Sequence, residues 1–249
     1  MTGNVLVAGA GSALARALAE GLALRGHGLV LAARDAAEAE RTAADLALRF
    51  GVPASSLGFD ARDAAATAAL VSRAEAALPG GLSGAVVAFA AMPSQEEVER
   101  DPAAGLEMTD VNVRSTMALL EAAAALLAER PGSFLCGFSS VAGDRGRRKN
   151  YAYGATKAAL SVALEGLSAR LAPKGVTVLC VKPGPADTAM AWGLFPPGSP
   201  LVARPETVAD DVLSALSRGR SVVYTPWFWR PVMALLRALP AAVFRRLPI

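Results

Sequence analysis

The sequence predicts a single α/β domain built on a doubly wound parallel sheet of about seven strands, with helices on both faces. The first observation is an alternation of short apolar runs with longer Ala-rich segments along most of the 249 residues. The second is that the short runs are almost continuously apolar, which is typical of parallel strands buried on both faces. The third is that no linker, low-complexity block or repeat divides the chain, whose hydrophobic content of 53% suits one large core. In such a fold the ligand crevice lies at the carboxyl ends of the strands.

The expected strands are short apolar runs bounded by Gly or polar residues. They are residues 4–9, 28–33, 55–60, 84–90, 133–139, 176–182 and 221–224. The expected helices fill the gaps between them. They are residues 12–24, 36–50, 64–78, 108–129, 151–171 and 205–218. This order assigns residues 1–225 to one domain and leaves residues 226–249 as a C-terminal amphipathic extension.

The extension is both apolar and basic. Residues 227–229 read Trp-Phe-Trp, and residues 221–249 hold four arginines and no acidic residue. Pro231 can begin a helix there, and Pro240 should end or kink it. Aromatic and Arg side chains on a short helix fit a bilayer interface, so one hypothesis is peripheral contact with a membrane or a lipid chain. The alternatives are a subunit interface in a homo-oligomer and a flap packed on the protein's own core.

Composition narrows the classes of function. Cys136 and Cys180 both lie in apolar, strand-like runs, which indicates buried thiols in a reducing compartment. With the lone His27 in a Gly-His-Gly turn, neither a metal cluster nor a Ser-His-Asp hydrolase is expected. The first strand begins almost at once, and no apolar run reaches the roughly 20 residues of a membrane span. We therefore expect a cytoplasmic protein; its body is near neutral, and no nucleic-acid partner is expected.

A Tyr and a Lys at helical spacing carry the most chemical information. Tyr153 and Lys157 lie four residues apart in an expected helix and can therefore point into one site. A free phenol has a pKa of about 10, and a neighbouring cation moves it toward the range that a general acid or base needs. Ser140 lies upstream, directly after an expected strand. Taken singly, each could be an ordinary surface or turn residue.

The turn after the first strand is suited to a phosphate. Small residues lead there into a helix N-terminus, whose N–H groups and dipole can receive a pyrophosphate. The residues expected to contact a dinucleotide are Gly9, Gly11, Ser12, Ala13 and Leu14. Ala13 and Ala15 stand where the usual dinucleotide fingerprint has glycine.

Two further strand ends are expected to contact the nucleotide. Arg34 follows the second strand where an acidic residue would bind a ribose 2′-hydroxyl, and its guanidinium suits a 2′-phosphate. This favours NADP(H) over NAD(H). Asp35 is expected to cap the next helix. Asp60 and Ala61 end the third strand, where the carboxylate could bond an adenine amine or, alternatively, cap a helix.

Together these features resemble the short-chain dehydrogenase/reductase family over essentially the whole chain, with a Rossmann-like fold. The resemblance rests on the small-residue turn 9–15, Asp110-Val111-Asn112-Val113, Ser139-Ser140-Val141-Ala142-Gly143 and Tyr153-x-x-x-Lys157. Ser140 stands thirteen positions before Tyr153, the separation that the family favours. The stretch Lys182-Pro183-Gly184-Pro185-Ala186-Asp187-Thr188 is similar to the family's loop over the nicotinamide.

The resemblance implies a role for each of these residues. Tyr153 would donate a proton to a substrate carbonyl, Ser140 would bond the carbonyl oxygen, and Lys157 would hold the nicotinamide ribose and ease deprotonation of the tyrosine. Asn112 would help to link the lysine to a water chain. Pro183, Gly184 and Thr188 would contact the nicotinamide, and Ala88 would border the adenosine. The Ala88-Phe89-Ala90-Ala91 stretch departs from the family's Asn-Asn-Ala-Gly motif.

Residues 141–154, the Lys-Pro-Gly stretch and the aromatic tail also resemble the decaprenylphosphoryl-2-keto-ribose reductase group. That resemblance implies reduction of a ketosugar on a lipid phosphate during cell-envelope synthesis. Arg145, Arg147 and Arg148 could then meet a substrate phosphate, or could form an ordinary solvated charge run. The alternatives for function are a general ketone or 3-oxoacyl reductase and a non-catalytic NADP-binding regulator.

Overall fold

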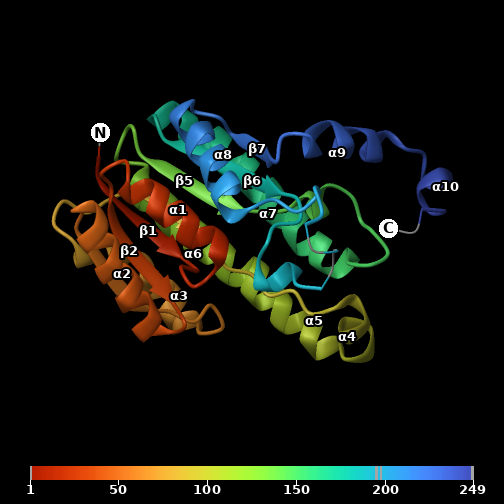
Figure 1. The fold of residues 1–249 in the computed structure, drawn as a ribbon, viewed down its shortest axis with the longest axis horizontal. Helices are drawn as coiled ribbons and strands as arrows, with labels where there is room; N and C mark the ends of the chain where they lie inside the picture. Colours follow the sequence, from red (N-terminus) through yellow and green to blue (C-terminus); the bar gives the residue numbers. More distant parts are fainter. Residues whose placement is uncertain (1, 194–195, 197, 248–249) are drawn as a thin grey trace.

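The computed structural model describes residues 2–193, 196 and 198–247, and within them seven parallel strands form one sheet (Figure 1). The strand order is β3-β2-β1-β4-β5-β6-β7, so the chain runs outward in both directions from β1. The strands are β1 (Asn4–Ala8), β2 (Gly28–Ala33), β3 (Ala54–Gly58), β4 (Leu82–Val87), β5 (Phe134–Phe138), β6 (Thr177–Pro183) and β7 (Val222–Thr225). The predicted doubly wound sheet is confirmed.

Helices cover both faces of this sheet. On one face lie α1 (Ala13–Ala23), α2 (Ala36–Phe50) and α8 (Pro205–Ser217). On the other lie α3 (Ala64–Ala77), α6 (Thr116–Leu127) and α7 (Tyr151–Leu171). The remaining helical elements are α4 (Gln95–Arg100), α5 (Pro102–Thr109), α9 (Trp229–Ala238), α10 (Ala241–Phe244), a π-helical turn η1 (Asp110–Ser115) and three 3-10 turns, η2 (Val141–Asp144), η3 (Ala172–Lys174) and η4 (Ala189–Ala191).

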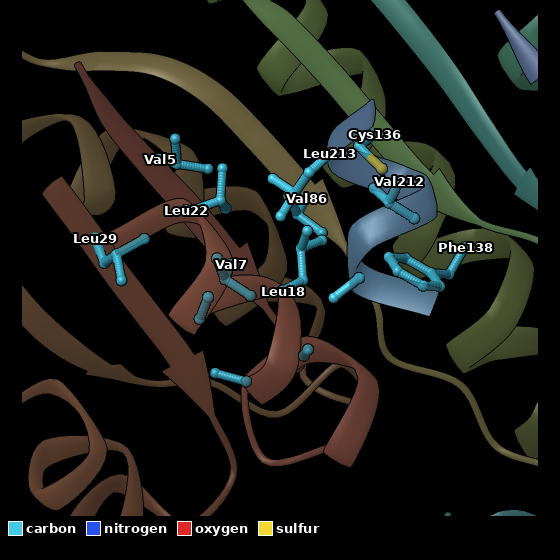
Figure 2. Packing of buried hydrophobic residues seen from close by; sticks show 14 of the residues in the cluster. Val5, Val7, Leu18, Leu22, Leu29, Val86, Cys136, Phe138, Val212 and Leu213 are labelled. Carbon is cyan, nitrogen blue, oxygen red and sulfur yellow. The ribbon is translucent and has the colours of Figure 1, made fainter. Parts of the chain in front are cut away.

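The core follows the alternation of side chains along each strand. In β1, Val5 and Val7 point to the α1 and α8 face, while Leu6 points to the opposite face. Figure 2 shows Leu18 and Leu22 of α1 packed over Val5 and Val7, with side chains of α8 beside them. Apolar side chains thus pack on both faces of the sheet, and each fully buried Leu stabilises the fold by about 1.5–3 kcal/mol. This packing supports the loops at the carboxyl edge of the sheet.

The helix predicted over residues 108–129 is interrupted. It consists of α5, the π turn η1 and α6, and the wider turn places Asn112 and Ser115 in the interior. The Ser115 hydroxyl donates to the carbonyl of Ala61, and Thr116 Oγ1 donates to the carbonyl of Val111 at 3.2 Å. Side-chain bonds of this kind compete with the regular helical ladder, and π turns are frequent at functional sites.

Helix α4 is an element that the sequence reading missed. It begins at a capping box, in which Ser94 Oγ accepts from the Glu97 amide at 3.1 Å and the Glu97 carboxylate accepts from the Ser94 amide at 3.1 Å. The Ser-x-x-Glu spacing was therefore an available signal.

Helix α9 begins at Trp229, two residues before Pro231, and ends at Ala238, ahead of Pro240. Its Met233 side chain is buried, and the helix continues outward from the end of β7 toward α10 (Figure 1). The extension is thus docked at Met233, while most of its surface stays exposed. Over the described part of the chain, no helix is both long and apolar enough to span a bilayer.

Candidate active site

The catalytic candidates converge because two glycines let a turn lie directly on a helix. Ser140 follows β5 and caps η2, its Oγ accepting from the Ala142 amide at 3.0 Å. A Cβ on Gly143 would stand 2.7 Å from the carbonyl carbon of Lys157, and one on Gly154 would stand 2.8 Å from the carbonyl oxygen of Ala142. The η2 turn therefore packs backbone to backbone on α7, beside the first turn that carries Tyr153.

Tyr153 and Lys157 lie on the same side of α7, as their spacing indicated. The Lys157 Nζ is 5.6 Å from the centre of the Tyr153 ring and donates to the carbonyl of Phe138 at 2.8 Å. Burial raises the pKa of the Tyr153 phenol, while hydrogen bonding to Ser140 lowers it by less. The expected lowering by the lysine is not found, because removal of the hydroxyl from water dominates.

The lysine responds to burial in the opposite sense. Its side chain is nearly inaccessible at 3% exposure, and burial lowers the pKa of Lys157 to about 8. An ammonium removed from water loses hydration, and here its one hydrogen-bond acceptor among the described residues is a neutral carbonyl. The lysine therefore titrates close to physiological pH, next to the phenol.

Asn112 joins three elements at the back of the site. Its Oδ1 accepts from the Ala91 amide at 2.7 Å, and its Nδ2 donates to the Ala91 carbonyl at 2.8 Å and to Thr156 Oγ1 at 3.1 Å. The side chain thus pins the segment after β4 to α7. Its partner Ala91 ends the Ala88-Phe89-Ala90-Ala91 stretch, which lacks the paired asparagines of the motif that it resembles. The expected water link from Asn112 to Lys157 stays a prediction.

The nucleotide turn has a geometry that only glycine allows. Gly9 has φ +91°, and a Cβ there would stand 2.7 Å from the amide nitrogen of Phe89. Ser12 caps α1 by accepting from the Ala15 amide at 3.2 Å, while Gly11 and Ala13 are exposed beside it. The N-terminus of α1 therefore opens to solvent at the carboxyl edge of the sheet, which fits a dinucleotide pyrophosphate. Leu14 is half-buried against the core.

The adenosine end is built from β2 and the segment after β3. Arg34 is exposed, and its charge helps to lower the pKa of Asp60, an effect that Arg62 dominates through hydrogen bonds. Asp60 Oδ2 accepts from Arg62 at 2.7 Å. The alternative that Asp60 caps a helix is wrong, because Asp63 caps α3. Asp35 caps α2 as predicted.

Two other expected cofactor residues are placed by the chain around them. Ala61 is buried and its carbonyl accepts from the Ser115 hydroxyl. Ala88 is half-buried, and its amide donates to the Ala8 carbonyl at 2.8 Å. These two backbone groups are thus already bonded within the protein, and the contact of Ala61 and Ala88 with a nucleotide stays a prediction.

The loop after β6 is covered by the C-terminal extension. A Cβ on Gly184 would overlap the indole of Trp229, whose Nε1 is buried with no acceptor among the described residues. Pro183 ends β6, and Thr188 Oγ1 donates to the Ala186 carbonyl at 3.4 Å. The aromatic tail stood out in the sequence as apolar and basic, but no motif or spacing predicted that Trp229 lies on this loop.

The basic loop divides into members with different roles. Arg145 donates to the carbonyls of Leu236, Arg237 and Leu239, the last two at 3.0 and 2.8 Å, and its guanidinium lies 4.0 Å from the Phe244 ring centre. Arg145 thus caps α9 and holds the tail, and its contact with a substrate phosphate stays a prediction. Arg148 is exposed. Arg147 is half-buried, and its Nε has no acceptor among the described residues.

Comparisons with known proteins find relatives along most of the chain. A family model described as "Enoyl-(Acyl carrier protein) reductase" matches residues 9–200. An uncharacterized oxidoreductase of Mycobacterium tuberculosis is 37% identical over 238 residues, covering 96% of this chain and 92% of the relative. An uncharacterized oxidoreductase of Streptomyces coelicolor is 32% identical over 252 residues, covering 99% of this chain and 96% of the relative.

Solved structures share the fold along most of the chain. A short-chain dehydrogenase from Sphingobium yanoikuyae in complex with NADPH has a TM-score of 0.82 at 26% identity, covering 96% of this chain and 97% of its own. A crystal structure provisionally assigned as a betaketoacyl-ACP reductase has a TM-score of 0.75 at 29% identity, covering 90% of this chain and 96% of its own. The family model's match over residues 9–200 includes both the turn after β1 and the positions of Ser140, Tyr153 and Lys157.

Proposed function

The chain belongs to the short-chain dehydrogenase/reductase family of oxidoreductases, and from that premise we propose that it reduces a ketone to an alcohol with NADPH. The observation that carries the proposal is the convergence of Ser140, Tyr153 and Lys157 at the carboxyl edge of the sheet, beside an open helix N-terminus. When bound, the cofactor supplies the hydride, and the protein orients the reactants and manages the proton.

The side chains suit the direction of reduction. Because burial raises the pKa of Tyr153, the phenol stays protonated at neutral pH and can donate to the oxygen of the ketone. Ser140 Oγ accepts from the Ala142 amide and its hydroxyl bonds to Tyr153. With a ketone in place, the same hydroxyl proton would turn to the ketone oxygen as negative charge develops there. Lys157 would hold the ribose hydroxyls of the cofactor and, when charged, favour transfer of the phenol proton.

We infer that the cofactor is NADP(H) in preference to NAD(H). Gly9, the uncovered N-terminus of α1 and the exposed Arg34 fit a dinucleotide with a 2′-phosphate. The similar Sphingobium enzyme, which was solved with NADPH, supports the same choice.

We propose a ketosugar on a lipid phosphate as the substrate. The support is Arg147 and Arg148, which lie between the catalytic serine and tyrosine, together with the exposed apolar surface of the tail. A second candidate is a 3-oxoacyl thioester, which the similar structure provisionally assigned as a betaketoacyl-ACP reductase favours. A fold-level likeness cannot separate the two, because one fold hosts many chemistries.

A substrate panel tests these proposals. NADPH consumption is followed with ribulose, ribulose 5-phosphate and acetoacetyl-CoA, and cofactor binding is measured separately by NADPH fluorescence. A ketosugar reductase turns over the first two and a 3-oxoacyl reductase turns over the third. Binding of NADPH without turnover of any ketone would instead favour a non-catalytic regulator.

The extension is proposed to contact an anionic membrane surface. Trp227 and Leu235 are 76% and 65% exposed, and all four arginines of residues 221–249 are exposed. Flotation with vesicles containing anionic lipid is expected for the full chain and not for a chain ending at residue 225. Equal flotation of both would refute the contact.

We also propose a homo-oligomer. Leu106 of α5 and Val162 of α7 are exposed apolar side chains on neighbouring helices, and such a surface is suited to a second copy of the chain. Light scattering on the wild type and on Val162→Glu tests this, with a monomeric wild type as the refuting result.

A further inference from the structure

A buried polar network lies beneath the turn that carries the catalytic serine. Asp144, the last residue of η2, accepts from Lys182 Nζ at 2.5 Å through Oδ1 and from the Tyr224 hydroxyl at 2.7 Å through Oδ2. The Asp144 and Lys182 side chains are 2% and 13% exposed. Neither the sequence patterns nor the reductase chemistry described above assigns a role to this group.

The sheet register explains why the two donors meet one carboxylate. Lys182 of β6 and Tyr224 of β7 are direct partners in the parallel ladder, so their side chains emerge side by side on the same face. The next pair along the ladder includes Thr225, whose Oγ1 turns to the opposite face and donates to Asp211 Oδ2 of α8 at 2.7 Å. The alternation of the strands thus directs Lys182 and Tyr224 to η2.

The charges in this network are consistent with a tight pair. Burial alone would lower the pKa of Lys182, but the Asp144 carboxylate outweighs it and the pKa is raised. The pKa of Tyr224 is raised by burial and by its bond to Asp144, so its hydroxyl remains a donor. Both oxygens of the carboxylate therefore have directed donors, which fixes the orientation as well as the location of Asp144.

The η2 turn is consequently held from two sides. On one side Gly143 lies against the backbone of α7, and on the other Asp144 is bonded to β6 and β7. The turn is capped by Ser140, whose hydroxyl lies close enough to Tyr153 to affect its pKa. Lys182 also immediately precedes the Pro183-Gly184 loop. A single carboxylate thus joins the serine turn to the loop after β6.

We propose that Asp144 is a positioning residue, which sets the place of Ser140 relative to Tyr153 by holding η2 on β6 and β7. This inference rests on the reductase function proposed above. A displacement of about 1 Å at a reacting group can reduce a rate about 100-fold. Loss of the tether should therefore lower kcat for ketone reduction by more than it changes the KM for NADPH, because the pyrophosphate turn after β1 and Arg34 after β2 lie at other strands.

The test separates position from stability. Asp144→Asn leaves a buried ammonium without its anion, so both Tm and kcat should fall, the latter by about 10- to 100-fold. Asp144→Leu with Lys182→Met removes both charges and should restore Tm, since apolar pairs commonly replace buried ion pairs well. Its kcat should stay at least about tenfold low, because the directed bonds to the turn are lost. Recovery of kcat together with Tm would overturn the proposal.

Glu75 provides a matched control, because it lies at the amino end of β4, away from the carboxyl edge that carries the site. Glu75 accepts from Arg130 at 2.6 Å and from the Leu82 amide at 2.7 Å, so Glu75→Gln also weakens a multiply bonded carboxylate. It should lower Tm without lowering kcat. Hydrogen exchange of residues 139–150 gives a readout that needs no substrate: it should be faster in Asp144→Asn and in the double variant, and unchanged in Glu75→Gln. If no ketone is reduced, the reductase function fails, and exchange alone decides whether Asp144 holds the turn.

Discussion

Gly143→Ala is expected to separate the serine turn from the tyrosine helix. The added Cβ would stand 2.7 Å from the carbonyl carbon of Lys157, 2.8 Å from the amide nitrogen of Ala158 and 2.9 Å from the Lys157 carbonyl oxygen. All three atoms belong to the backbone of α7, which has no rotamer with which to yield. The turn must therefore move outward by somewhat under 1 Å to reach an ordinary van der Waals contact of about 3.5 Å.

The size of the effect follows from two independent costs. Overpacking of this kind destabilises by about 1–3 kcal/mol. At about 2–4 °C per kcal/mol for a chain of this size, Tm should fall by several degrees. The displacement also carries Ser140 away from Tyr153, which should lower kcat for NADPH-dependent ketone reduction by about 10- to 100-fold.

A control for this prediction lies three residues further on. A Cβ on Gly146 meets no atom within 4 Å, and its backbone does not adopt a positive φ. Gly146→Ala should therefore leave kcat unchanged and change the stability by less than about 1 kcal/mol. If Gly143→Ala matched Gly146→Ala in both Tm and kcat, the close approach of η2 and α7 would not be what brings the site together.

Three further outcomes are expected. Tyr153→Phe should lower kcat by at least about 100-fold while NADPH fluorescence titration shows unchanged binding, because only the proton donor is lost; retained turnover would exclude Tyr153 as the acid. Burial lowers the pKa of Lys157 to about 8 from 10.5. Between these two pH values the unfolded chain keeps on this lysine a proton that the folded chain has lost, so the free energy of unfolding should rise with pH. Lys157→Met should be more stable at pH 7 in thermal unfolding and lack this rise, so an unaltered pH profile would contradict the burial argument. Arg34→Ala should raise KM for NADPH about tenfold and leave KM for NADH nearly unchanged, whereas equal changes would refute contact with a 2′-phosphate.

Local sequence alone was sufficient for the strands, for most of the long helices and for the relation of Tyr153 to Lys157. The near-continuous apolar runs predicted a parallel sheet, because a strand buried on both faces has no polar side to show. The four-residue spacing of Tyr153 and Lys157 placed both on one side of α7, because that relation depends only on the helical period. Asp35 was likewise recognisable as a cap, since capping is a contact within one turn.

Contacts between distant segments could not be read in this way. Three contacts depend on the register of β6 and β7 and on the path of the tail: Arg145 holds the end of α9, Trp229 lies on Gly184, and Asp144 binds Lys182. The pKa of Tyr153 belongs to the same class, because it is set by how completely the folded protein removes the hydroxyl from water. Periodicity and capping are properties of neighbouring residues, whereas burial and long-range pairing arise only when the whole chain has packed.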